Sequence, residues 1–112
     1  MLTIYKAIRI SPIHFAICIA LLNEEDVFIN KKGHTVCKRL YVVDIVDKDR
    51  HSIAETGYSY WQSNDCPDKE PFIYTVGRWS TDDTEMGIYY FNSWEDTIEY
   101  MRMKEWMKSF FE

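Results

Sequence analysis

Three apolar segments rich in β-branched residues constrain the fold of this chain most strongly. They run from Leu2 to Ile10, from Ile13 to Leu22 and from Thr35 to Val46. Side chains that branch at Cβ pack well on a pleated surface and favour strands. Because good helix signals occur only near the end of the chain, we expect an α+β fold. Its mixed, mostly antiparallel sheet is packed by a C-terminal amphipathic helix.

The first two segments are both expected to be strands. In the first, Ile4, Ile8 and Ile10 share one face, and Tyr5 and Ala7 share the other. This alternation is typical of a half-buried strand. The second segment is apolar on both faces, which fits either a buried strand or a helix that begins after the Ser-Pro pair at positions 11 and 12. Its β-branched and aromatic residues favour the strand.

The third segment predicts one long central strand, because it is apolar on both faces. One face carries Cys37, Tyr41, Val43 and Ile45, and the other carries Val36, Leu40, Val42 and Val46. A short strand is expected before it at residues 27–29. A polar turn lies between these two strands, and its last residue is Gly33, which can take a positive φ.

The chain after the third segment predicts a long irregular loop followed by two short strands. The loop is expected from Ser52 to Pro71, and loops of this length are often functional. The strands are expected from Phe72 to Val76 and from Gly87 to Phe91, with a polar turn between them at residues 80–85.

The last element is expected to be a helix whose start is marked by Ser93 with Asp96 three residues later, or by Asn92 with Glu95. Acidic residues come first and basic residues last, an order that suits the helix dipole. The apolar stripe changes face: Trp94, Ile98 and Met101 lie together, whereas Met103, Trp106, Met107 and Phe110 lie opposite. Either the helix bends near Arg102, or its second half packs on a partner or a second copy.

Composition fits a single domain over residues 1–112 that lies in the cytoplasm. The formal net charge of −5 argues against a nucleic-acid binder, which normally has a basic patch. Three cysteines do not form a disulfide framework. No apolar run reaches the roughly 20 residues of a membrane span, and the first residues lack the features of a secretory signal.

Motifs for metal or nucleophilic chemistry are weak. His34 and Cys37 have zinc-ligand spacing, and Cys66 with Asp65 or His51 could complete four ligands. No second close pair exists, so a buried thiol and a turn histidine are the better interpretation. We expect no metal and no cofactor, and the chain lacks the glycine pattern of a phosphate-binding loop.

An ADP-ribosyltransferase-like enzyme, or a binder of nucleotide ligands, is the enzymatic alternative. Arg9 at the end of the first strand, the aromatic run of Tyr58, Tyr60 and Trp61, and a late acid such as Glu85 follow the order of such sites. This alternative rests on analogy, because the order alone carries no specific motif.

A family resemblance covers roughly residues 4–101. It is carried by residues 5–9, 37–45, 72–77, 87–91 and 93–100, which read YKAIR, CKRLYVVDI, FIYTVG, GIYYF and SWEDTIEY. Their order resembles a small uncharacterised domain of phage and giant-virus proteins that is often found beside pentapeptide repeats. That family tends to have a cysteine before the glycine and a histidine after it, where this chain has Met86 and Tyr89. The resemblance implies a viral setting, with the host cytoplasm as location, and brings no established activity.

The expected function is that of a non-enzymatic protein-binding module, a small viral accessory protein that inhibits a host defence protein in the manner of an anti-CRISPR protein. The predicted partner is a host protein or a second copy, bound through the C-terminal helix. The expected binding residues are aromatic or methionine side chains from two places: Met103, Trp106, Met107 and Phe110 of the helix, and Tyr58, Tyr60 and Trp61 of the loop.

Overall fold

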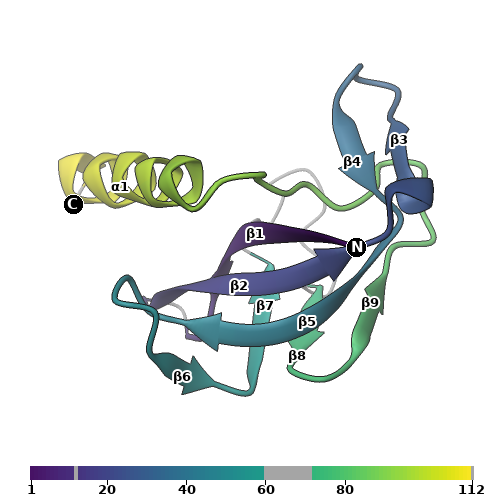
Figure 1. Cartoon of the computed structure of the whole chain (residues 1–112). Coiled ribbons are helices and arrows are strands. Elements are labelled where there is room, and N and C mark those ends of the chain that lie inside the picture. Colours follow the sequence, from purple (N-terminus) through teal and green to yellow (C-terminus); the bar gives the residue numbers. More distant parts are fainter. Residues whose placement is uncertain (12, 60–71, 112) are drawn as a thin grey trace.

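The computed structural model describes residues 1–11, 13–59 and 72–111, with side chains described as far as Met103. The described strands are β1 (Leu2–Arg9), β2 (Phe15–Leu22), β3 (Val27–Ile29), β4 (Thr35–Cys37), β5 (Arg39–Val46), β6 (Ser52–Ala54), β7 (Thr56–Ser59), β8 (Ile73–Thr75) and β9 (Trp79–Thr81). One α-helix, α1 (Trp94–Phe111), follows them (Figure 1). The described chain is therefore mostly sheet with one C-terminal helix, broadly the α+β class that the sequence predicts.

The main sheet is antiparallel in every described pairing and curls into a half-barrel. Its strands follow the order β6-β5-β2-β1-β7-β8, and β9 pairs with β5. The Ser80 hydroxyl of β9 donates to the carbonyl oxygen of Ile73 in β8, with 3.2 Å between the oxygens. Since β9 joins β5 and also approaches β8, the two ends of the sheet come together. The inner face is thereby enclosed.

The inner face holds the larger core. It consists of buried aliphatic, cysteine and tyrosine side chains: Ile4, Ile8, Ala16, Cys18, Ala20, Leu22, Cys37, Leu40, Val42, Ile45, Tyr74 and Ile88. Even-numbered residues of β1 and β2 point inwards, as the two-residue period of a strand requires. The predicted face of Ile4, Ile8 and Ile10 is therefore confirmed.

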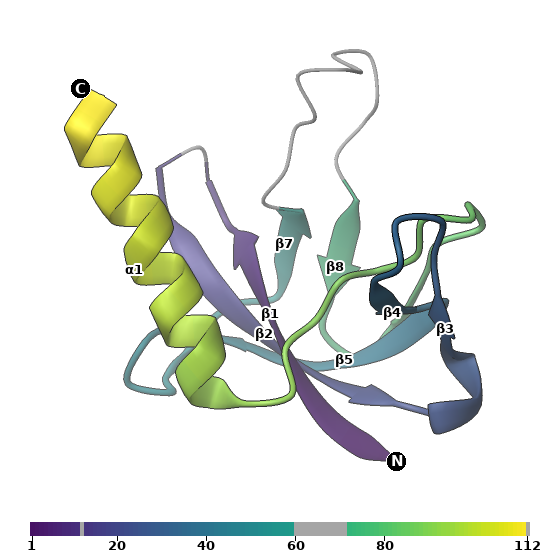
Figure 2. The same ribbon diagram turned by 90° about the horizontal axis from the view of Figure 1, so that it is seen from above.

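The outer face carries a second, smaller core under the start of α1. Met101 is buried against Ala7, Ile17 and Val46, and Trp94 and Ile98 pack beside it. The helix begins as predicted: the backbone N–H of Asp96 donates to the Ser93 hydroxyl at 3.1 Å. Figure 2 shows α1 along one side of the sheet, beside β1 and β2. In the described part of the chain, no helix is long and apolar enough to cross a membrane.

The predicted single strand from Thr35 to Val46 is wrong in two respects. It breaks at Lys38 into β4 and β5, and β4 pairs with β3 in a separate hairpin. In β5, Ile19 is paired with Asp44 and Ala20 with Val42, so Val43 is an extra residue. Such a bulge reverses the alternation, and Ile45 therefore joins the inner face with Leu40 instead of opposing it.

Three predictions for the chain after β5 also need correction. Residues 52–59 form β6 and β7, although the sequence predicts a loop there. The predicted polar turn from Ser80 begins with β9, which pairs with β5. The expected strand from Gly87 to Phe91 makes only isolated bridges, from Ile88 to Cys37 and from Phe91 to Tyr5. These short segments depend on tertiary pairing, which local periodicity does not record.

Candidate functional site

An aromatic pair, with Trp79 exposed and Tyr41 half-buried, lies on the part of the outer face beyond the helix contact. In the register of the sheet, Tyr41 of β5 faces Leu21 of β2 and Trp79 of β9. Leu21 alternates with the inward-facing Ala20 and Leu22, so all three paired side chains share the outer face. The rings of Tyr41 and Trp79 meet edge to face, with 5.5 Å between centroids and 65° between planes.

Arg39 completes this group, which we call the outer aromatic cluster (Arg39, Tyr41 and Trp79). The Arg39 guanidinium carbon lies 4.8 Å from the centroid of the Trp79 ring. Its Nε donates to a carboxylate oxygen of Asp26 at 3.0 Å, which fixes the guanidinium over the ring. Trp79 is nevertheless 44% exposed, and the neighbouring Val43 is 43% exposed. An exposed Trp and Arg beside a half-buried Tyr have the composition of protein-binding hot spots.

The sequence-predicted binding residues are described only in part. Met103 is 58% exposed, as expected for the second apolar face of the helix. The side chains of Trp106, Met107 and Phe110 lie outside the described residues, as do Tyr60 and Trp61. Tyr58 is half-buried in β7. The outer aromatic cluster was missed because β9 was not predicted. The alternating aromatic and apolar residues of β5 were the only available signal.

The residues of the enzymatic alternative are partly brought together. Arg9 and Tyr58 are cross-strand neighbours, and the Arg9 guanidinium carbon lies 5.6 Å from the Tyr58 ring centroid. Glu85 instead forms a 2.6 Å ion pair with Lys31, in the turn between β3 and β4. That hairpin stands near the start of β1, whereas Arg9 ends the strand (Figure 1). Glu85 therefore does not join Arg9 and Tyr58.

The zinc ligands considered from the sequence are separated among the described residues. The His34 ring nitrogen Nδ1 lies 3.0 Å from the Tyr89 hydroxyl at the β3–β4 hairpin. Cys37 is buried in the inner core, and burial raises the pKa of its thiol to about 11. His51 lies in a different hairpin, after β5. Cys66 and Asp65 lie outside the described residues.

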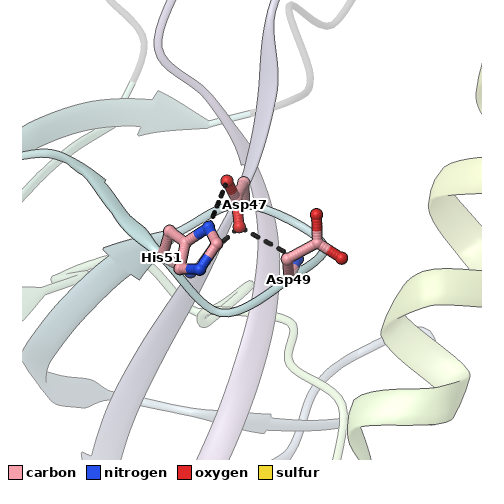
Figure 3. Close-up of side chains that lie close together, drawn as sticks. All are labelled: Asp47, Asp49 and His51. Carbon is pink, nitrogen blue, oxygen red and sulfur yellow. Dashed lines mark hydrogen bonds and ion pairs between the residues drawn. The ribbon is translucent and has the colours of Figure 1, made fainter.

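His51 belongs to the turn between β5 and β6, where it groups with Asp47 and Asp49 (Figure 3). One carboxylate oxygen of Asp47 accepts the backbone N–H groups of Asp49 and His51, both at 2.9 Å. These hydrogen bonds lower the pKa of the Asp47 carboxyl, with that from His51 as the largest cause. The carboxylate thus stabilises a tight turn, in which Arg50 has a positive φ of 66°.

Lys6 is a second feature that reasoning from sequence missed. It lies between Ile4 and Ile8 on the inner face and is paired with the buried Cys18 across β1 and β2. Its ammonium donates to the Tyr89 carbonyl oxygen at 2.7 Å and lies 6.0 Å from the Tyr74 ring centroid. Desolvation lowers the Lys6 pKa to about 8. The two-residue alternation of β1 was a sufficient signal for its inward position.

Comparison with known proteins adds no relative: no protein-family model, no curated protein and no solved structure matches this chain. Its function must therefore be inferred from its own surfaces and side chains.

Proposed function

We propose that the chain is a non-enzymatic protein-binding module that docks through the outer aromatic cluster. The observation that carries this proposal is the Tyr41–Trp79 pair with Arg39 held over the indole, a rigid group that stays open to solvent. Rigid aromatic anchors bind with little loss of side-chain entropy, which is why they dominate interface energetics. In the viral setting implied by the family resemblance, the partner is a host protein that the module inhibits, such as one of a defence system.

The charges around Trp79 specify the chemistry of the partner surface. Arg39 lies over the ring and the exposed Arg78 precedes it in the chain. The Arg39 guanidinium, which also pairs with Asp26, is the cationic group that lies against the indole, on a chain of net charge −5. We therefore expect a partner that presents an acidic side chain next to an apolar one. Binding of this kind weakens as salt increases.

The second half of α1 supplies a further contact in this proposal. Met101 is buried on the sheet whereas Met103, two residues later, is mostly exposed. Trp106, Met107 and Phe110 continue the face of Met103 by helical spacing. Their replacement tests whether the partner also contacts the helix end.

The experiment is a quantitative capture of host proteins with three versions of the chain. Trp79→Ala removes the anchor, and Ile29→Ala is the matched control, because Ile29 is 70% exposed on the separate β3–β4 hairpin. We expect wild type and Ile29→Ala to retain the same partner and Trp79→Ala to bind it about 30-fold more weakly, the loss typical of a hot spot. Circular dichroism checks that all three are folded.

Equal affinity of the folded Trp79→Ala variant for the partner contradicts the proposed surface. Sedimentation of the chain alone tests the other possible occupant of this surface, a second copy of the chain. Self-association that is lost in Trp79→Ala assigns the cluster to a second copy and rejects the acidic host partner.

The stacking of Arg9 on Tyr58 favours the second candidate, a nucleotide-ligand or ADP-ribosyltransferase-like site. An arginine held on an aromatic ring is suited to a phosphate and an adjacent ring. Titration calorimetry with NAD and ADP-ribose tests it: saturable binding that is lost in Arg9→Gln supports this candidate. Absence of binding at millimolar ligand rejects it.

A further inference from the structure

The inner face of the half-barrel contains a lysine in a setting built mainly of apolar side chains. Lys6 has Ile4 and Ile8 on either side along β1 and Cys18 opposite it in β2. The Tyr74 ring faces it from β8. No described carboxylate lies within ion-pair distance of Lys6, unlike Lys31 and Arg39, which are both paired. The Lys6 ammonium is therefore surrounded by carbon and sulfur atoms and one carbonyl group, in place of water and a counter-ion.

The ammonium is held in place by one hydrogen bond, and Lys6 as a whole residue is half-buried. It donates to the Tyr89 carbonyl oxygen at 2.7 Å. One hydrogen bond of this kind orients the nitrogen without neutralising it, and it leaves the remaining N–H groups for other contacts.

The groups that face Lys6 hold no charge of their own near neutral pH. Burial raises the pKa of the Cys18 thiol to about 12 and that of the Cys37 thiol to about 11. Burial also raises the pKa of the Tyr74 phenol well above its ordinary value. These three groups, from β2, β4 and β8, are uncharged at pH 8. Desolvation is then the dominant influence on Lys6 and lowers its pKa to about 8.

We propose that Lys6 is a nucleophilic amine site for small, uncharged carbonyl compounds, with aldehydes as the ligand class. Solvent first takes one proton from the ammonium. The nitrogen lone pair then adds to the carbonyl carbon, and the carbinolamine loses water to give an imine. Addition and loss of water balance without any oxidant or reductant. The imine nitrogen then takes one proton back from solvent, and the resulting N–H can donate to the Tyr89 carbonyl oxygen. Lysines in desolvated pockets perform this chemistry in enzymes.

The ligand class follows from the surroundings. The apolar side chains beside Lys6, which are Ile4, Ile8 and Tyr74, favour an uncharged, partly apolar aldehyde. A cationic aldehyde is disfavoured, because no described carboxylate lies beside Lys6 to balance a second positive charge.

The test measures reductive alkylation of the whole chain by propanal and cyanoborohydride, with each site assigned by tandem mass spectrometry. At pH 7 we expect Lys6 to react about tenfold faster than the exposed Lys31 and Lys32, because a much larger fraction of its amine is unprotonated. The Lys6 rate should level off near pH 8, the pKa that its burial sets. The α-amino group of Met1 is also a primary amine that reacts with aldehydes, so its labelling is counted separately.

Two comparisons make the result decisive. In urea the Lys6 advantage should disappear, because the effect depends on the folded inner face. Lys32→Met, the matched control, should leave Lys6 labelling unchanged. A Lys6 rate in the folded chain that is equal to or below that of Lys31 and Lys32 at pH 7 overturns the proposal, whether the cause is an ordinary pKa or an amine that the aldehyde cannot reach.

Discussion

The outer face of the sheet is divided into two regions that differ in what covers them. Over one region, Trp94, Ile98 and Met101 of α1 pack on Ala7, Ile17 and Val46. Over the other, Tyr41 and Trp79 face outwards beyond the helix contact, and Trp79 stays 44% exposed. The chain thus uses its one described α-helix, α1, to close part of an apolar face. In the function we propose, the covered region serves stability and the open region serves binding.

The largest expected effect concerns the covered region. Met101→Ala should lower the free energy of unfolding by about 2–5 kcal/mol, because it leaves a cavity beneath the helix. Met103→Ala is the matched control, since Met103 is 58% exposed, and it should change stability by no more than about 0.5 kcal/mol. Urea denaturation measures both. Equal losses for the two variants contradict the assigned contact of α1 with the sheet.

The next effect concerns the open region, where a substitution should reduce affinity for the partner much more than stability. Tyr41→Ala removes the ring that supports Trp79 and should cost about 1 kcal/mol of stability, the contribution of one edge-to-face aromatic pair, since Tyr41 is only half-buried. Its affinity for the captured partner should fall by at least tenfold. Urea denaturation and calorimetry give the two values. A stability loss as large as that of Met101→Ala, with unchanged affinity, would make this region structural.

A smaller effect tests how firmly the helix is held over the covered region. Ser93→Ala removes the hydroxyl that accepts the Asp96 N–H and should cost about 1 kcal/mol. Ser93→Asp keeps an acceptor at this position and should retain nearly all the stability. Thermal unfolding of the three proteins shows the order. If Ser93→Ala melts with wild type, the cap does not contribute to the helix contact.

The smallest effect concerns the inner face. It is the change in the free energy of unfolding with pH, which the two outer regions do not determine. Lys6 has a folded pKa of about 8 against an ordinary 10.5, so the unfolded chain binds more protons between these values. Stability should therefore rise with pH from about 8 towards 9. Above pH 9, Cys18 and Cys37 keep protons that the unfolded chain loses, and stability should fall.

Lys6→Met isolates this contribution, because it keeps the apolar stem and removes the amine. The rise between pH 8 and 9 should be absent in this variant, whereas the fall above pH 9 should remain. A rise of equal size in both proteins assigns it to another group.

Local sequence predicts the parts of this fold that local physics determines. Alternation placed Ile4 and Ile8 inwards correctly, and the capping residues located the start of α1. Local sequence could not reveal the bulge at Val43, because the extra residue is accommodated by the pairing of β5 with β2. Nor could it predict β9, a three-residue strand that exists through its hydrogen bonds to β5.

The candidate site was missed for the same reason. Arg39, Tyr41 and Trp79 come from two strands whose neighbourhood is set only by the closure of the sheet. The sequence did identify Met103 as an exposed apolar residue of the helix, and the structure agrees for that side chain. Lys6 was placed on the correct strand, but its hydrogen bond to Tyr89 joins segments far apart in the chain.

Hydroxyl-radical footprinting of the chain with and without its captured partner tests the central claim most directly. The method reports side-chain exposure, and Tyr41, Trp79 and Met103 are all readily oxidised groups on described parts of the surface. We predict that the partner protects Tyr41 and Trp79 at least severalfold, while the exposed Met86 on a different segment is oxidised as before. Protection of Met103 together with unchanged oxidation of Tyr41 and Trp79 contradicts the assignment of binding to the open region of the sheet.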